Sequence, residues 1–280
     1  MRALFLIPGD GLQQLQAFPA VAATAEQLGF TIQVACSPEQ APLWKLLPVV
    51  EKLIPFSFGD ATLADWANLL GSVRDPDFQV AINLAPSRQM DLMLSMSHIP
   101  TRVASSGFSA TTRVSEPPAG WGAQSLAGYL SPVGVSLDAS AFRLAIQPSA
   151  LAEATAGLPP GDGPLLLLAP AGGPTDWPEI HWQQLPDRIR ANLPSLRCRQ
   201  LPPATVATAS RRAAEIAASD VVLASDPLTI ELALYCGTPL VALGRGSESL
   251  PARDGVSGVA PAGSLASLGL DPVLQALGLN

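Results

Sequence analysis

Short apolar segments alternate with longer amphipathic segments along most of the chain. The apolar segments have three to seven residues, which is too short for buried helices, and several are rich in β-branched side chains. They therefore predict strands that are covered on both faces of a sheet. We expect nine such strands, at residues 3–7, 31–35, 53–58, 78–84, 102–104, 165–169, 195–201, 221–224 and 240–243.

The segments between these strands have apolar residues at the spacing of an amphipathic helix. The clearest are at residues 12–28, 63–73, 148–158, 179–191, 208–218 and 227–236. Strands that alternate with helices are typical of α/β folds, in which helices cover both faces of a parallel sheet. The sequence therefore predicts doubly wound parallel sheets, and domain sizes of ~100–200 residues favour two domains in this chain.

Composition and charge exclude several classes of protein. Hydrophobic residues make up 48% of the chain and charged residues 14%, which excludes general disorder. The net charge is −7 and the 16 basic residues are scattered, so the clusters that nucleic acids require are missing. No apolar run approaches the ~18 to 20 residues that span a bilayer, and the run at 3–8 is too short for a secretory signal. We therefore expect a cytoplasmic protein that binds no nucleic acid and has no transmembrane segment.

Cysteine and histidine positions give no indication of a metal site. Cys36, Cys198 and Cys236 share no ligand spacing and lie in or beside apolar segments, so we expect three reduced, buried thiols. His98 and His181 have no Cys, Asp or Glu partners at ligand spacing. No metal is expected.

The stretch at residues 219–246 contains a buried strand, an acidic turn, a helix and a second buried strand. Asp226 is a suitable helix N-cap, Pro227 suits the first helical position, and Gly237 ends the helix. Such a unit leaves a crevice at the carboxyl ends of its strands, where free N–H groups at the helix start favour an anion. Asp226 is therefore a candidate ligand-binding residue, although a helix cap alone explains an Asp before Pro.

Two further turns follow predicted strands. One contains Gly172, Gly173 and Thr175, and glycines after a buried strand let backbone N–H groups approach a diphosphate closely. An ordinary turn between a strand and a helix has the same features, so both interpretations stay open. The other turn places Asp10 in a Gly-Asp-Gly sequence, which is common without any chemistry.

The run Asp226-Pro-Leu-Thr-Ile-Glu-Leu-Ala-Leu-Tyr-Cys-Gly-Thr-Pro239 resembles a signature of a known family. This is the nucleotide-sugar-binding signature of the ADP-heptose:lipopolysaccharide heptosyltransferases, which usually has the sequence D-S-G-P-M-H-L-A-A-A-L-G-T-P. Six positions match: Asp226, Leu232, Ala233, Gly237, Thr238 and Pro239. Pro227 and Leu228 replace the family's Ser-Gly pair, and Glu231 replaces its histidine.

The resemblance extends to the turn after residues 165–169. The family has P-G, then K-x-W-P and a further Trp in this region. Trp177, Pro178 and Trp182 match that pattern, while Thr175 stands at the position of the family's lysine.

The first half of the chain is also similar to the family. The opening strand with its Gly-Asp turn matches, as does the segment at 78–107, in which Asn-Leu precedes a helix and an Arg-Val strand. Asp10 and Pro19 are nine residues apart, about three more than in the family. Residues 124–137 resemble the linker helix that precedes the second domain, which places the boundary between residues 140 and 141.

The resemblance implies a GT-B fold, in which two doubly wound, Rossmann-like domains face one another across a cleft. Residues 1–140 would form the acceptor-side domain and residues 141–280 the nucleotide-sugar-binding domain. The implied activity is inverting, metal-independent transfer of a sugar from a nucleotide-diphosphate donor, preferably an ADP-sugar, to a hydroxyl of a glycan or lipid-linked acceptor. No cofactor is implied, and the protein would be cytoplasmic, including peripheral association with a membrane.

The resemblance also assigns roles to individual residues. Asp10 would be the general base that removes the proton of the acceptor hydroxyl. The residues that would bind the donor are Gly172, Gly173, Thr175, Asp226, Leu228, Thr229 and Glu231.

Several replacements favour a different interpretation, a catalytically degenerate glycosyltransferase fold that binds a protein partner as an assembly or scaffold factor. Thr175 in place of lysine removes a cation expected to hold the donor phosphates, which costs several kcal/mol of transition-state stabilisation. Glu231 in place of histidine would contact sugar hydroxyls or lie on the surface of its helix. The predicted loop at 107–123 has one basic residue, Arg113, where the family has several. A GT-B-type nucleotide-sugar epimerase is a third interpretation, against which the scarcity of His and Arg argues.

Overall fold

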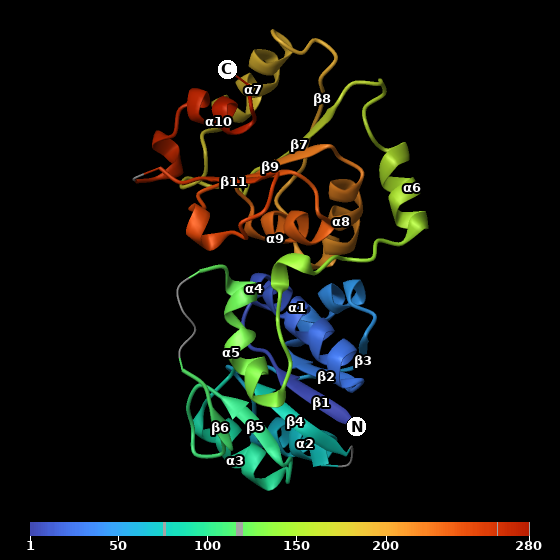
Figure 1. Cartoon of the computed structure of the whole chain (residues 1–280), viewed down its shortest axis with the longest axis vertical. Coiled ribbons are helices and arrows are strands. Elements are labelled where there is room, and N and C mark those ends of the chain that lie inside the picture. Colours follow the sequence, from blue (N-terminus) through green and yellow to red (C-terminus); the bar gives the residue numbers. More distant parts are fainter. Residues whose placement is uncertain (75–76, 116–119, 262, 280) are drawn as a thin grey trace. The chain divides into compact units, whose positions relative to one another are not determined.

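The chain divides into two compact units, Met1–Phe142 and Arg143–Asn280 (Figure 1). The computed structural model describes residues 1–74, 77–115, 120–261 and 263–279. None of the described helices is both long and apolar enough to cross a lipid bilayer.

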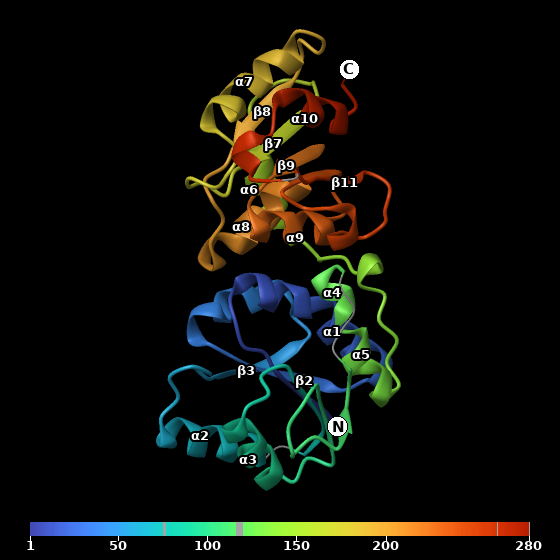
Figure 2. The ribbon, with the colours of Figure 1, turned by 90° about the vertical axis from the view of Figure 1, so that its left-hand side faces the viewer.

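The first unit contains a six-stranded parallel sheet with the order β3-β2-β1-β4-β5-β6. Its strands are β1 (Arg2–Leu6), β2 (Thr31–Cys36), β3 (Val50–Pro55), β4 (Phe78–Asn83), β5 (Thr101–Ala104) and β6 (Thr112–Arg113). Its helices are α1 (Gly11–Leu28), α2 (Leu63–Arg74), α3 (Arg88–Met96), the short α4 (Gly122–Ser125) and α5 (Ala127–Leu130), and the 3₁₀ helices η1 (Pro38–Leu46), η2 (Ser131–Val133) and η3 (Ala139–Ala141). Helices α2 and α3 cover one face of this sheet, and α1 with α4 and α5 lies on the other (Figure 2).

The second unit contains a five-stranded parallel sheet with the order β11-β10-β9-β7-β8. Its strands are β7 (Leu165–Ala169), β8 (Arg197–Gln200), β9 (Val221–Ala224), β10 (Leu240–Leu243) and β11 (Val256–Val259). Its helices are α6 (Pro148–Ala156), α7 (Glu179–Arg190), α8 (Ala209–Ala217), α9 (Pro227–Cys236) and α10 (Leu270–Ala276), and the 3₁₀ helices η4 (Val206–Thr208), η5 (Ser247–Ser249) and η6 (Leu265–Ser267). Helices α7 and α10 pack on one face and α8 and α9 on the other, with α6 against α8 (Figures 1 and 2).

The α/β class with parallel sheets is confirmed, and the differences from the sequence prediction are local. The third strand, expected at 53–58, begins at Val50 and ends at Pro55. Ser37 as an N-cap predicts a helix after it, but the segment forms the 3₁₀ helix η1, in which Pro42 has no N–H for an α-helical hydrogen bond. The predicted loop at 107–123 contains the two-residue edge strand β6 and the start of α4, while its residues 116–119 lie outside the described residues. Strand β11 was also not expected, because its Val-Ser-Gly-Val sequence has no apolar run.

The strand order of each sheet reverses at one point. In the first unit the chain proceeds from β1 to β2 and β3 on one side, and then from β4 to β6 on the other. In the second unit it proceeds from β7 to β8, and then from β9 to β11 on the opposite side. Loops diverge where the order reverses, and open α/β sheets bind ligands at the carboxyl ends of these strands. Candidate ligand-binding sites are therefore expected at the carboxyl ends of β1 and β4 and of β7 and β9.

All three cysteines are free thiols, with Cys36 buried and Cys198 and Cys236 half-buried. Burial is the main reason that the pKa of Cys36 and Cys198 is raised to about 11 and that of Cys236 to about 12. Because the thiolate is the reactive species, roughly a thousandth of each thiol or less is reactive near pH 8. We expect alkylation by iodoacetamide to be roughly a hundredfold faster in denaturing urea than in the folded chain, as measured by mass spectrometry. Rapid labelling of the folded chain would contradict this expectation.

Candidate functional site

The turn after β7 and the turn after β9 meet at the switch point of the second unit. The N–H groups of Ser225 and Asp226 both donate to the carbonyl oxygen of Ala169, at 3.1 and 3.2 Å. The N–H of Ala171 donates to the hydroxyl oxygen of Ser225 at 2.8 Å. Two predicted donor-binding segments, far apart in the sequence, are therefore held side by side.

In the turn after β7, the carboxylate of Asp176 lies where the sequence predicts a bound diphosphate. Gly172 and Gly173 have φ values of +78° and +90°, which side chains with a Cβ rarely adopt. In this conformation the N–H of Gly172 donates to Asp176 Oδ2 at 2.7 Å, and the N–H of Trp177 donates to Asp176 Oδ1 at 2.7 Å. Asp176 is only 7% exposed. The chain's own carboxylate thus occupies part of the predicted diphosphate cradle.

The other residues of this turn are either exposed to solvent or packed in the core. Thr175 is exposed, and the N–H of Gly173 has no acceptor among the described residues. Trp177, which matches the family pattern, is buried and donates its indole N–H to the carbonyl oxygen of Leu268 at 2.8 Å. Its ring also lies edge to face with Trp182 at 5.0 Å between centroids. The two tryptophans therefore fix the turn to the core, which leaves the Gly173 amide as a donor for a ligand.

Asp226 caps α9, as its position before Pro227 indicates. Its Oδ2 accepts hydrogen bonds from the N–H of Thr229 at 2.7 Å and from the Thr229 hydroxyl at 2.5 Å. Asp226 is 5% exposed and Thr229 is fully buried, while Leu228 is half-buried. Pro227 has no N–H, so the Leu228 N–H is the first-turn amide without an acceptor in the described part of the chain.

The sequence did not indicate Arg212, which extends this cluster. The guanidinium group donates through Nη1 to the Thr229 hydroxyl oxygen at 2.7 Å and through Nη2 to the carbonyl oxygen of Pro202. Arg212 is 3% exposed, and burial lowers its pKa while Asp226 and Glu215 oppose that shift. The sequence did contain a pattern that could have revealed it. Arg212 has the helical spacing of the apolar residues that form the buried stripe of α8, which are Ala209, Ala213 and Ile216. A cation within such a stripe indicates a buried partner.

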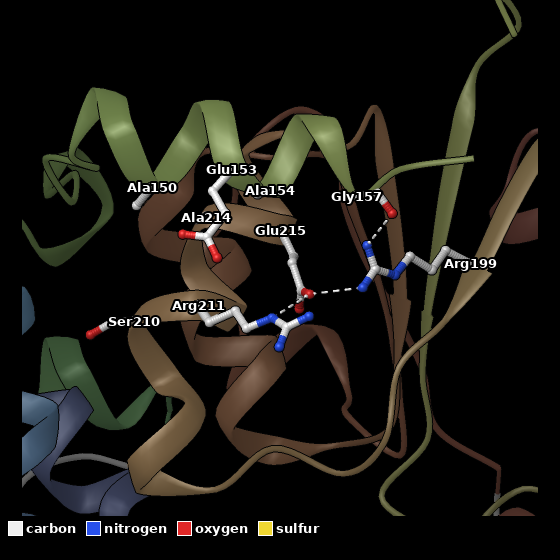
Figure 3. A pocket seen from close by; sticks show the side chains of 9 residues that line it. All are labelled: Ala150, Glu153, Ala154, Gly157, Arg199, Ser210, Arg211, Ala214 and Glu215. Carbon is white, nitrogen blue, oxygen red and sulfur yellow. Dashed lines mark hydrogen bonds and ion pairs between the residues drawn. The ribbon is translucent and has the colours of Figure 1, made fainter. Parts of the chain in front are cut away.

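An ion-pair network connects Arg212 to a surface pocket of about 240 Å³ between α6 and α8 (Figure 3). Glu215 Oε1 accepts from Arg199 Nη2 at 3.0 Å and from Arg211 Nε at 3.2 Å. Glu215 Oε2 lies 3.8 Å from Arg212 Nε. Three guanidinium groups therefore surround one buried carboxylate, and the innermost of them reaches the N-terminus of α9.

Glu231, at the position of the family's histidine, is 2% exposed. The Tyr235 hydroxyl, one turn later on α9, donates to Glu231 Oε1 at 3.3 Å. Burial, followed by the nearby Glu231 carboxylate, raises the pKa of Tyr235. The expectation that Glu231 could lie on the helix surface is wrong, because the side chain is buried and accepts a hydrogen bond from Tyr235.

Asp10 lies in the first unit, after β1, and is exposed. It caps α1: its Oδ1 accepts from the N–H groups of Leu12 and Gln13 at 3.0 and 3.2 Å. Its own N–H donates to Gln13 Oε1 at 2.9 Å, which completes a capping box. The second carboxylate oxygen has no hydrogen-bond partner among the described residues and is available to accept a proton.

Comparison with known proteins gives the fold a name. No protein-family model and no curated protein sequence matches the chain. Among solved structures, a glycosyl transferase family 9 protein from Veillonella parvula matches 99% of this chain and 96% of its own, with a TM-score of 0.76 and 14% identity. E. coli ADP-heptose LPS heptosyltransferase II matches 99% and 98%, with a TM-score of 0.73 and 17% identity. E. coli heptosyltransferase WaaC with ADP-2-deoxy-2-fluoro heptose matches 99% of both chains, with a TM-score of 0.70 and 14% identity.

The chain has the fold of a GT-B glycosyltransferase. The resemblance inferred from the run at 226–239 is therefore confirmed at the level of the fold, and it covers nearly the whole chain. At identities of 14 to 17% the likeness establishes the fold alone.

Proposed function

We propose that the chain is a heptosyltransferase-like glycosyltransferase that moves a sugar from a nucleotide-diphosphate donor to a hydroxyl group. The observation that supports this most is the match over 99% of the chain to such enzymes, together with an Asp226–Thr229 cap at the switch point. We favour an ADP-sugar as donor, because one neighbour is described with ADP-2-deoxy-2-fluoro heptose. The acceptor would be a glycan or a lipid-linked sugar.

The proposed reaction inverts the anomeric carbon and needs no metal. The acceptor oxygen forms a bond to that carbon while the bond to the diphosphate oxygen breaks, and the nucleoside diphosphate leaves with the electron pair. Asp10 accepts the hydroxyl proton on its unpaired oxygen. The amides of Gly173 and Leu228 donate to the diphosphate, and Asp226 with Thr229 positions the sugar or ribose. Gly172, Thr175 and Glu231 have no direct role in this scheme.

A specific observation favours a second candidate, a catalytically degenerate protein that binds a partner as an assembly factor. The carboxylates of Asp176 and Asp226 already occupy three amides of the crevice. A leaving diphosphate would meet these negative charges, and Thr175 supplies no cation to offset them.

Calorimetric titration of the full chain with ADP-, UDP- and GDP-sugars separates the two candidates. If the chain is a transferase, we expect the ADP-sugar to bind most tightly. Asp226→Asn should then weaken the binding of the ADP-sugar about tenfold, which is ~1.4 kcal/mol. Asparagine keeps the helix cap but loses the charge. The control is Asp162→Asn, which removes an exposed carboxylate elsewhere in the second unit.

Transfer is then assayed with the donor that binds. Release of the nucleoside diphosphate that depends on an added acceptor and is lost in Asp10→Asn supports the transferase. A folded chain that binds none of the nucleotides contradicts it and favours the second candidate.

A further inference from the structure

A pocket of about 200 Å³ lies at the switch point of the first unit, next to the turn that contains Asp10. It is bounded by the ends of β1 and β4, by the first turns of α1 and by α4 and α5. The side chains that matter for its chemistry are those of Gln13, Gln16 and Tyr129.

Gly9 leaves the space that the carboxamide of Gln13 occupies. Gln13 Oε1 accepts the N–H of Asp10, so the side chain folds back over the turn. A Cβ at Gly9 would lie 1.6 Å from Gln13 Oε1, and Gly9 has a φ of +89°. Only glycine fits there. Gln13 Nε2, whose two N–H groups have no acceptor in the described part of the chain, remains for a ligand.

Gly122 likewise leaves the space that the carboxamide of Gln16 occupies. A Cβ on Gly122, the first residue of α4, would lie 2.5 Å from both Cδ and Oε1 of Gln16. The amide therefore lies directly on the backbone of α4. Within the described residues neither its oxygen nor its nitrogen has a hydrogen-bond partner. Two carboxamides on α1 thus occupy space that two glycines leave free, and both retain hydrogen-bonding capacity.

The remaining lining is uncharged. Tyr129 contributes a largely buried ring with a hydroxyl, and Pro8 and Leu84 contribute apolar surface. None of the described lining residues is Lys, Arg, Asp or Glu. A phosphate or carboxylate entering here would lose hydration without gaining an ion pair, and the exposed Asp10 carboxylate nearby would repel it.

We propose that this pocket binds an uncharged, hydroxyl-bearing sugar unit of the acceptor and excludes phosphorylated or acidic sugars. A carboxamide offers a donor and an acceptor in one plane, which matches two neighbouring hydroxyl groups, and the ring with the apolar residues covers the C–H face of a sugar. That the bound sugar is an acceptor rests on the proposed transferase function. The neutrality of the ligand rests on the lining alone.

Saturation-transfer NMR with the full chain tests the proposal. The neutral probes are the methyl glycosides of glucose, galactose, mannose and N-acetylglucosamine, and the charged probes are methyl glucuronide and glucose 6-phosphate. We expect at least one neutral glycoside to bind at least fivefold more tightly than both charged probes. Gln16→Ala should weaken that binding at least fivefold, whereas Gln89→Ala, an exposed glutamine on α3, should leave it unchanged.

Gly122→Ala provides an independent test, because it displaces the Gln16 amide without removing it. It should weaken the binding of the neutral glycoside as much as Gln16→Ala does. The double variant should show no further loss of affinity. Thermal unfolding checks that each variant is folded. Equal or tighter binding of a charged probe, no binding of any neutral glycoside, or unchanged binding in Gln16→Ala overturns the proposal.

The proposed function can fail separately. Binding of a neutral glycoside without binding of any nucleotide sugar supports the pocket and contradicts the transferase. Tight binding of an ADP-sugar together with a preference for glucose 6-phosphate supports the transferase and contradicts the proposed pocket.

Discussion

Replacing Arg212 by Met is expected to lower the free energy of unfolding of the second unit by about 3 to 5 kcal/mol, the usual cost of breaking a buried ion pair. The guanidinium group is 3% exposed, hydrogen-bonds Thr229 and Pro202, and lies near two buried carboxylates. Methionine fills a similar volume but leaves the Thr229 hydroxyl without its donor and removes a positive charge that interacts with Asp226. The loss should appear as a lower midpoint in urea unfolding of the full chain.

Arg211 provides a matched control, because it precedes Arg212 and pairs with the same Glu215. Its side chain is 74% exposed, and exposed ion pairs contribute little to stability. Arg211→Met should therefore change the stability by less than about 1 kcal/mol. If Arg212→Met and Arg211→Met unfold at the same urea concentration, the buried ion-pair network does not stabilise the second unit.

The features that the sequence could predict are those that depend on neighbouring residues. Val221–Ala224 is an unbroken apolar run, and it forms a buried strand. Asp226 before Pro227 caps a helix because both preferences are local. The Gly-Asp turn at Asp10 likewise begins α1. Local patterns of this kind were sufficient for the α/β class and for the positions of most strands.

The features that could not be predicted depend on tertiary contacts. Whether Gly172 offers its N–H to a ligand depends on where Asp176 turns, and that is set by the packing of Trp177. The burial of Glu231 depends on what packs around α9, in which all residues from 229 to 235 are buried. Arg212 acquires its role only through Thr229, which lies 17 residues away.

The second large effect is expected at Asp176, where removal of the negative charge should strengthen the binding of ADP. Asp176→Asn should raise the affinity for ADP about tenfold, which corresponds to ~1.4 kcal/mol. The carboxylate now accepts the N–H groups of Gly172 and Trp177, at 2.7 Å each, in a turn that would otherwise offer them to a phosphate. Asparagine has nearly the same shape but removes the negative charge and holds at most one of these amides well.

The same substitution should lower stability by about 1 to 2 kcal/mol, because charge-assisted hydrogen bonds become neutral ones. Glu179→Gln is the matched control, since it removes an exposed carboxylate three residues further along the chain. It should change neither property appreciably. Calorimetry with ADP and thermal unfolding measure the two effects, and raising the ionic strength should reduce the gain in affinity. If Asp176→Asn binds ADP no better than the unsubstituted chain, the Asp176 carboxylate is not a competitor of the phosphates. If it binds ADP more weakly, this carboxylate supports the bound nucleotide instead.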